Sequence, residues 1–255
     1  MINLGGTDST SSAAVSVSRD GSVVIGKVGN AGAGIWHWNA ATGSYGSMMT
    51  SSGINPFTGS SVTVTPGFVS PNGLWAASAG TAFGINYGDP LRPRRITQAG
   101  IINAATGEAM AIPLDHIVDT AVGSTDRLLN AGIIVTGVSD TGVVIGSYIG
   151  CQGCNAPLST VDAWIYNAAT NTTQTFDSFL AANGIALTPT QHVYNLSAMS
   201  ADATAISGYL FDTSINQTVG FIAHVNTVPE PGQWLTLALG LPLLGLLARR
   251  RSRGQ

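Results

Sequence analysis

The densest group of ionisable side chains is the short segment Asp115-His116-Ile117-Val118-Asp119. A histidine beside carboxylates can act as a general base in hydrolysis when a nucleophile stands next to it. The sequence contains no Gly-x-Ser-x-Gly elbow that would supply such a nucleophile. A hydrolase built on Asp115, His116 and Asp119 therefore ranks last among the interpretations. We expect this segment to be a polar loop and the protein not to be an enzyme.

The two cysteines, Cys151 and Cys154, form a Cys-Gln-Gly-Cys segment. A zinc site would need a second pair of ligands, and no histidine lies near in sequence. A redox Cys-x-x-Cys normally opens a helix, whereas Gly150, Gly153 and Asn155 favour a loop here. We expect a small disulfide that pins this loop. A free or labile thiol pair is the alternative, and redox catalysis ranks below both.

Three aspartates, Asp20, Asp140 and Asp202, recur at matching places in a repeated sequence. Carboxylates could ligate a metal ion, but none of the three lies in an Asp-x-Asp-x-Asp-Gly calcium loop. Turn formation explains them, because an aspartate side chain bonds to the backbone two residues on. We expect neither a metal site nor a cofactor.

Composition and charge favour an exported, β-rich protein. Only 9% of the 255 residues are charged, while 32 are glycine. Residues 1–227 hold six Lys/Arg against twelve Asp/Glu, and the remaining residues hold four Arg and one Glu. An acidic body does not suggest nucleic-acid binding, because the phosphate backbone attracts basic surfaces. The basic residues are instead gathered at the C-terminus.

The elements that must position these residues come from an internal repeat. The first copy contains Ser18-Arg-Asp20-Gly21-Ser-Val-Val-Ile-Gly26, followed by an aromatic segment and Asn39-Ala-Ala-Thr-Gly43. Val15 and Val17 alternate with serines, as in a half-buried strand, and Asp20-Gly21 predicts a tight turn. Each unit should therefore run strand, turn, strand, loop, strand, turn. The copies cover residues 14–43, 69–107, 138–171 and 199–225.

One such sheet cannot bury both of its faces alone, so the units must stack or close into a ring. We expect an all-β body resembling a β-propeller, with a β-sandwich or an irregular β-solenoid as alternatives. Two short helices are predicted between copies, at Ser124–Gly132 and Asp177–Gly184. Residues Gly43–Gly67 and Asp89–Arg95 are predicted to be surface loops.

Aromatic and basic side chains offer a second hypothesis, carbohydrate binding. Tryptophans could form a stacking platform for sugars, although burial between sheets is the favoured interpretation. An arginine group could contact an acidic polysaccharide, although a solvated loop is favoured. The side chains concerned are Trp36, Trp38, Trp75 and Trp164, with Arg92, Arg94 and Arg95. His37, between two of the tryptophans, is expected to face solvent on the opposite side of its strand.

The last residues of the chain form three successive parts. Pro229-Glu230-Pro231 comes first, an uncharged apolar run follows from Trp234 to Ala248, and basic residues close the sequence. The basic residues are Arg249, Arg250, Arg251 and Arg253. As a helix the apolar run would span about 22 Å at roughly 1.5 Å per residue, which is short for a hydrocarbon core of about 30 Å. The arginines favour the cytoplasmic side and place the body outside.

Both parts of the chain resemble known families. The tail resembles the PEP-CTERM sorting signal, and the repeat is similar to the extracellular HAF repeat over most of residues 1–226. This resemblance implies a Gram-negative bacterial protein that is exported by the Sec route. It also implies processing near Pro229-Glu230-Pro231 by an exosortase, with Arg249–Arg253 as a stop-transfer cluster, and an association with exopolysaccharide or biofilm.

These observations define two segments, a repeat body at 1–226 and a sorting signal at 227–255. We expect a non-catalytic matrix or surface protein that is held transiently in the inner membrane and then released to the cell envelope or matrix. The expected partners are an exosortase, the inner membrane and, in the alternative reading, exopolysaccharide. Because Met1–Asp8 lacks the basic and apolar regions of a signal peptide, we expect the natural start to lie upstream.

Overall fold

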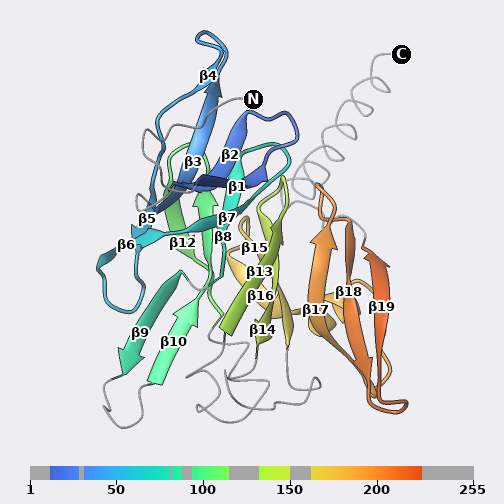
Figure 1. The fold of residues 1–255 in the computed structure, drawn as a ribbon. Helices are drawn as coiled ribbons and strands as arrows, with labels where there is room; N and C mark the ends of the chain where they lie inside the picture. Colours follow the sequence, from blue (N-terminus) through green and yellow to red (C-terminus); the bar gives the residue numbers. More distant parts are fainter. Residues whose placement is uncertain are drawn as a thin grey trace, which may run out of the picture.

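The structure, a computed structural model, describes residues 12–28, 32–80, 82–87, 94–114, 132–149 and 162–225. Strands dominate this part of the chain, and its one helix is the short α2 (Phe176–Ala182) (Figure 1). The prediction of an all-β body is therefore confirmed for these residues. The tail, with Pro229–Pro231, Trp234–Ala248 and the arginine cluster, lies outside the described residues.

Each repeated segment forms an antiparallel meander, in which strands that follow one another in sequence pair side by side. The first sheet has the order β1-β2-β3-β4, the third β13-β14-β15-β16, and the fourth β17-β18-β19. The first contains β1 (Ser12–Val17), β2 (Val23–Val28), β3 (Gly32–Asn39) and β4 (Ser44–Tyr45). The third contains β13 (Gly132–Val138), β14 (Val143–Ile149), β15 (Ala163–Asn167) and β16 (Thr172–Thr175). The fourth contains β17 (Gln191–Met199), β18 (Ala205–Asp212) and β19 (Gln217–His224).

The second repeat lies within a larger sheet of order β6-β5-β12-β11-β8-β7. Its meander is β7-β8-β11-β12, and the β9–β10 hairpin is inserted between β8 and β11. The hairpin β5–β6 joins this sheet because β5 pairs in parallel with β12. The strands are β5 (Ser51–Ile54), β6 (Ser61–Val64), β7 (Pro66–Val69), β8 (Trp75–Ser78), β9 (Phe83–Tyr87), β10 (Arg94–Gln98), β11 (Gly100–Asn103) and β12 (Glu108–Ala111).

Three local predictions need correction. Gly43–Gly67 is not a loop, because it contains β4, β5, β6 and the start of β7; its valines and threonines favour strands when a neighbouring sheet edge can pair with them. Strand β10 begins at Arg94, inside the segment predicted to be a loop. Gly132, predicted to end a helix, begins β13, and the remainder of that predicted helix lies outside the described residues.

The helix predicted at Asp177–Gly184 is confirmed, with a shift of its beginning. The N-cap is Thr175, whose hydroxyl accepts from the backbone N–H of Ser178, so Asp177 lies in the first turn. Gly184 follows the helix with a φ of +77°, as a terminating glycine does. The buried residues of α2 pack on β15 and on the fourth sheet.

The sheets pack face to face in the order of the chain. The first sheet packs on the second through a cluster that includes Ile25 and Ile102. The second packs on the third through Ile101 and Val144, and the third on the fourth through Ile145. Adjacent residues such as Val144 and Ile145 thus serve opposite interfaces, because side chains alternate across a strand. The second and third sheets are therefore covered by a neighbouring sheet on each face, except at β5 and β12 of the second sheet, where Ile54 and Met110 are exposed.

A serine closes the turn at the start of each meander. Its hydroxyl accepts from the backbone N–H of the first residue in the following strand, at 2.9–3.0 Å. The four serines are Ser18, Ser70, Ser139 and Ser200. The repetition of this contact explains why a serine recurs in all four turns, since the hydroxyl satisfies a backbone group that the turn would leave unpaired. We call this contact the serine latch.

Successive turns also bond to one another, so they form a row along one end of the sheets. The Arg19 N–H donates to the Pro71 carbonyl at 2.7 Å, and the Asp140 N–H donates to the Ala201 carbonyl at 2.8 Å. Between these bonds, the Asn72 N–H donates to Asp140 Oδ1 at 2.7 Å. The row therefore links all four meanders in chain order.

Each of the two outermost sheets has exposed apolar side chains on the side that faces away from its neighbouring sheet. Val17 on the first sheet and Ile222 on the fourth are exposed, although both belong to apolar strand positions. The described residues thus form a row of sheets and not the closed ring of a propeller. In Figure 1 the fourth sheet lies at one side of the molecule, away from the first.

Candidate functional site

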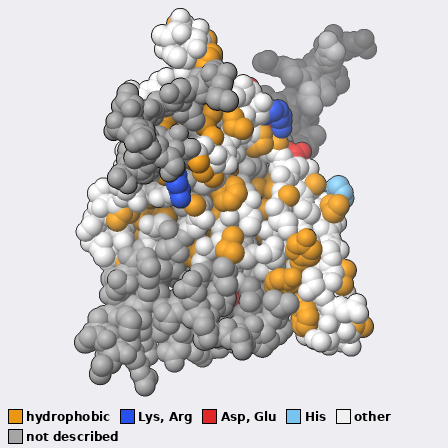
Figure 2. Space-filling view, in the orientation of Figure 1, with side chains coloured by type: hydrophobic (Ala, Val, Ile, Leu, Met, Phe, Trp, Pro, Cys, Tyr) orange, Lys and Arg blue, Asp and Glu red, His pale blue; other side chains and the backbone are white. Residues whose placement is uncertain are grey.

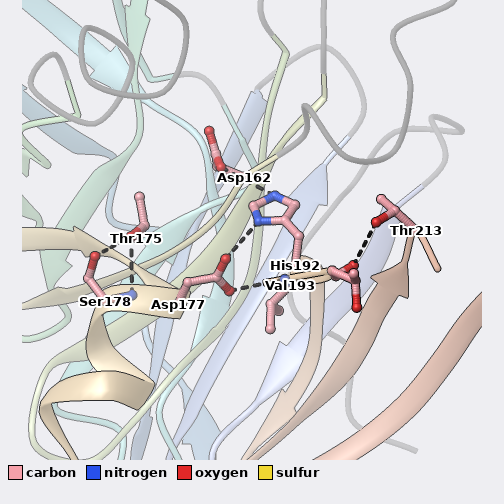
Figure 3. Close-up of polar contacts among 8 residues, drawn as sticks. Asp162, Thr175, Asp177, Ser178, His192, Val193 and Thr213 are labelled. Carbon is pink, nitrogen blue, oxygen red and sulfur yellow. Dashed lines mark hydrogen bonds and ion pairs between the residues drawn. The ribbon is translucent and has the colours of Figure 1, made fainter. Parts of the chain in front are cut away.

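The strongest cluster of ionisable groups in the described residues surrounds His192, at the start of β17 (Figure 3). His192 Nδ1 lies 2.7 Å from Asp177 Oδ2, and its Nε2 lies 3.3 Å from Asp162 Oδ1. Asp177 comes from the first turn of α2, and Asp162 directly precedes β15. The three residues therefore connect the third sheet, the helix and the fourth sheet.

Asp177 makes a further contact that fixes its orientation. Its Oδ1 accepts from the backbone N–H of Val193 at 3.0 Å, while Oδ2 faces the imidazole of His192. The first turn of a helix suits a carboxylate, because the unpaired N–H groups there carry partial positive charge. One side chain thus joins α2 to two successive residues of β17. The sequence offered no signal for this cluster beyond the position of Asp177 in a predicted helix.

The geometry of the cluster favours a clamp over a catalytic dyad. In a His–Asp dyad one ring nitrogen binds the carboxylate and the other faces a nucleophile. Here both ring nitrogens face carboxylates, and an imidazole satisfies both contacts only when each nitrogen carries a proton. Among the described residues no three acidic, His or Cys side chains converge on a common point that could hold a metal ion.

The aspartates of the turns act as acceptors within their own turns. Asp20 Oδ1 accepts from the backbone N–H and hydroxyl of Ser22 and from the Ser18 hydroxyl, and these bonds lower its pKa to about 2. The hydroxyl of Ser200 and the backbone N–H and hydroxyl of Thr204 lower the pKa of Asp202 to about 2 in the same way. The prediction of a turn-forming role is confirmed for both.

Asp140 departs from this pattern. The third turn is one residue shorter, and Thr141 stands beside the latch serine Ser139 instead. Asp140 Oδ1 is consequently free to accept from the Asn72 N–H of the second meander, and the Asn72 side chain donates to the Asp140 carbonyl at 3.2 Å. The aspartate that fails to close its own turn thus ties two sheets together.

The tryptophans do not form a common platform. Trp36 and Trp164 are buried, each against a glycine of the neighbouring strand, Gly26 and Gly146. Trp75 is half-buried at the interface of the second and third sheets. The favoured interpretation, burial between sheets, is confirmed for Trp164, which lies between the second and third sheets.

Trp38 is the exception, because its ring remains partly exposed. It contacts Tyr45 edge to face, with ring centroids 5.2 Å apart and an interplanar angle of 73°. His37, expected to face solvent, is half-buried instead, and its Nε2 lies 2.8 Å from the Ala104 carbonyl of the second sheet. That prediction was wrong because the side of β3 opposite the tryptophans is covered by the second sheet.

The structure does not describe the side chains of the other predicted site residues. Arg94 and Arg95 belong to β10, but their side chains are not described. The remaining candidates lie outside the described residues altogether: Arg92, Asp115, His116, Asp119, Cys151, Cys154 and the sorting signal at 227–255. In the part of the chain that is described, no helix is long and apolar enough to cross a membrane.

A shallow groove of about 500 Å³ lies along the parallel pair β5 and β12. Its walls combine the exposed apolar side chains of Ile54 and Met110 with the hydroxyls of Ser52 and Ser61. Glu108 is the one ionisable residue in this lining. A single carboxylate without an acid or base partner does not form the paired arrangement of a glycosidase. The groove therefore offers a surface for contact rather than a reaction centre.

Comparison with protein-family models and with curated protein sequences finds no match for this chain.

Proposed function

We propose that this chain is an exported, non-catalytic building block of the cell surface or biofilm matrix. The observation that carries the proposal is how the repeated side chains are used. The latch serines, the turn aspartates and the buried tryptophans hold strands and sheets together, and His192 is engaged by carboxylates on both ring nitrogens. The side chains that recur between units therefore serve packing, which is the requirement of a scaffold.

The sorting part of the proposal rests on the tail of the sequence. An exosortase would cut near Pro229-Glu230-Pro231 while the apolar run Trp234–Ala248 holds the chain in the inner membrane. Prolines on both sides of Glu230 restrict the backbone choices of their neighbours and favour an extended chain, which would suit a processing enzyme. The mature body would then be released to the envelope or matrix. For the repeat body we propose a propeller-like arrangement of the meanders, with a β-sandwich or an irregular β-solenoid as the alternatives.

Mass spectrometry of the C-terminus tests this proposal in the natural host. The matrix fraction should contain a product that ends near Pro229–Pro231 and lacks Arg253. Glu230→Ala should instead accumulate in the membrane with Arg253 retained, while the neighbouring Thr227→Ala serves as the matched control. A mature extracellular product that retains Arg253 would contradict the sorting proposal.

A second candidate function is carbohydrate binding, and the exposed ring of Trp38 favours it. Its edge-to-face contact with Tyr45 fixes the orientation of an aromatic surface on which a sugar could stack. Pull-down with exopolysaccharide from the host measures this directly. Saturable binding that is lost in Trp38→Ala would support the lectin reading, whereas the scaffold proposal expects no difference between that variant and the unaltered chain.

A further inference from the structure

The two ends of the row of sheets present two different surfaces. On the first sheet, Ile25 and Ile35 pack on the second sheet, so Val17, Val24, Trp36 and Trp38 point to the other side. We call these four residues the incoming face. On the fourth sheet, Ile206, Leu210 and Ala223 pack toward the third sheet and α2. The alternate residues Ser207, Tyr209 and Ile222, which we call the outgoing face, point away.

Inside the molecule, the same positions are buried by a neighbouring sheet. Ile222 pairs with Ser207, as Ile165 pairs with Ile145 in the third sheet. Ile165 is 5% exposed because the fourth sheet covers it, whereas Ile222 is 70% exposed. The outgoing face of the fourth sheet therefore corresponds to the face of the third sheet that the fourth sheet covers. In the fourth sheet no further sheet of the described residues covers it.

The incoming face is exposed at two of its four residues, Val17 and Trp38. Val17 precedes its latch serine as Val138 does in the third sheet, yet Val17 is 58% exposed and Val138 is 7% exposed. Tyr166 holds the place of Trp38 in the repeated sequence and is 1% exposed, against 36% for Trp38. Trp36 and Val24 are already buried on this face, so Val17 and Trp38 form its exposed part.

The hydrogen bonds between successive turns indicate how a second copy would be oriented and which opposite charges would meet. Within the chain, the residue after the latch serine donates its N–H to the equivalent carbonyl of the next meander, as in Arg19 to Pro71 and Asp140 to Ala201. A further step would run from the Ala201 N–H to the Arg19 carbonyl of another copy. It would bring the exposed carboxylate of Asp202 close to the exposed guanidinium of Arg19.

We propose that the outgoing face of one copy packs on the incoming face of a second copy, head to tail, and continues the interface that joins the sheets within the chain. Because the two faces differ, the contact is heterologous and closes into a ring or extends as a filament. Figure 2 shows hydrophobic side chains gathered over the region of β17–β19. The proposed partner is thus a second copy of this chain. The biological role of this contact rests on the proposed matrix function.

Mixing two complementary variants of the full chain tests the geometry. Ile222→Glu should prevent association through the outgoing face, and Val17→Glu should prevent association through the incoming face. The reason is that burying an unpaired carboxylate at an apolar contact is costly. By light scattering after size exclusion, the unaltered chain should rise in mass with concentration. Each variant alone should keep the mass of one chain. An equimolar mixture should form a dimer, since each variant retains the face that the other lacks.

The matched control is Ile54→Glu, because Ile54 is 61% exposed on a strand that belongs to neither face. This variant should associate like the unaltered chain. Circular dichroism confirms that the strands are retained; if a Glu variant unfolds, Val17→Ser and Ile222→Ser replace the pair, with Ile54→Ser as control. The inference fails if the unaltered chain keeps the mass of one chain, if both face variants still associate, or if their mixture forms no dimer.

The failure of this inference is distinguishable from the failure of the proposed function. The mass measurement requires neither export nor cleavage. If the chain is processed near Pro229–Pro231 but never associates, only the head-to-tail contact is contradicted. If the chain associates but its matrix form retains Arg253, only the sorting proposal is contradicted.

Discussion

Gly146 lies directly beneath the indole of Trp164, and the contact is so close that a Cβ on this glycine would overlap the ring and the Ile134 carbonyl. The two residues are cross-strand partners on β14 and β15. The arrangement lets the largest side chain of the repeat lie flat on its own sheet while it packs against the second sheet. The glycine that ends the Val-Val-Ile-Gly pattern is therefore required for close approach.

Gly146→Ala should destabilise the protein by about 3 kcal/mol, because the added methyl group meets a backbone carbonyl that cannot move without disturbing β13. Chemical denaturation followed by tryptophan fluorescence measures this change. Gly46→Ala is the matched control, since the nearest atom to its added Cβ is the His37 carbonyl at 3.8 Å. Equal stability of the two variants would contradict the proposed role of the close approach.

Ser139→Ala should destabilise the protein by about 1–3 kcal/mol, because it leaves the backbone N–H of Val143 without its hydroxyl acceptor in a partly buried turn. Ser70→Ala should have a similar effect through the N–H of Trp75. The exposed Ser61→Ala should change the free energy of unfolding by less than about 0.5 kcal/mol. If only one of the two variants, Ser139→Ala or Ser70→Ala, lowers the free energy of unfolding, the serine latch does not have the same role in each turn.

The turn carboxylates predict loss of stability in acid. Asp20 and Asp202 have folded-state pKa values of about 2, below the ordinary value of 3.8. Their contribution is therefore complete above the unfolded value and is lost as the pH falls through the folded value. Unfolding measured between pH 5 and pH 2 should show this loss over about pH 4 to 2.

The double variant Asp20→Asn with Asp202→Asn should reduce that pH dependence while the turns persist, because an amide oxygen accepts the same bonds without titrating. Asn72 already does so in the second turn, where it accepts from the Ser70 hydroxyl and the Leu74 N–H. In Ser200→Ala, an NMR titration should place the pKa of Asp202 closer to 3.8. An unchanged value would show that the Ser200 hydroxyl is not its main stabilising partner.

The clamp around His192 predicts coupling between α2 and the fourth sheet. His192→Gln should destabilise by about 1–3 kcal/mol, since hydrogen bonds to charged groups exceed neutral ones. A double-mutant cycle with Asp177→Asn isolates the pair, and the exposed His224→Gln paired with Asp177→Asn is the control. Hydrogen exchange should show faster opening of β17 than of β14 in the His192 variant. Additive energies in the His192 cycle would contradict the clamp.

The strand pattern of the body was predictable because it depends on local signals. Alternating valines, an Asp-Gly turn and a short aromatic run specify a hairpin and its neighbour without reference to the rest of the chain. The same signals placed Asp177 at the beginning of a helix. The prediction missed Thr175 as the N-cap, because either residue suits that position and only the packing of Phe176 decides between them.

The contacts between units were not predictable, because they join residues that are distant in sequence. Nothing in the sequence relates Asp162 to His192, or Asp140 to Asn72, until the sheets have stacked. The Ser51–Val64 segment was missed for a related reason. Its first strand, β5, pairs with the distant β12 in the parallel direction, and the polar composition of Ser51–Ile54 gives no period that separates it from a loop. His37 was misplaced because the sequence does not show which side of β3 another sheet will cover.

The parallel pairing of β5 with β12 has a consequence for the order in which the chain folds. Meanders such as β17–β19 need only neighbouring residues, so they can form as soon as their own strands have emerged. The β5–β6 hairpin can join its sheet only when Glu108 and Ala109, more than fifty residues later, are available to pair with β5. The first half of the body should therefore mature as one late, cooperative event. The two C-terminal meanders pair only strands that are neighbours in sequence, so they should form without waiting for that event.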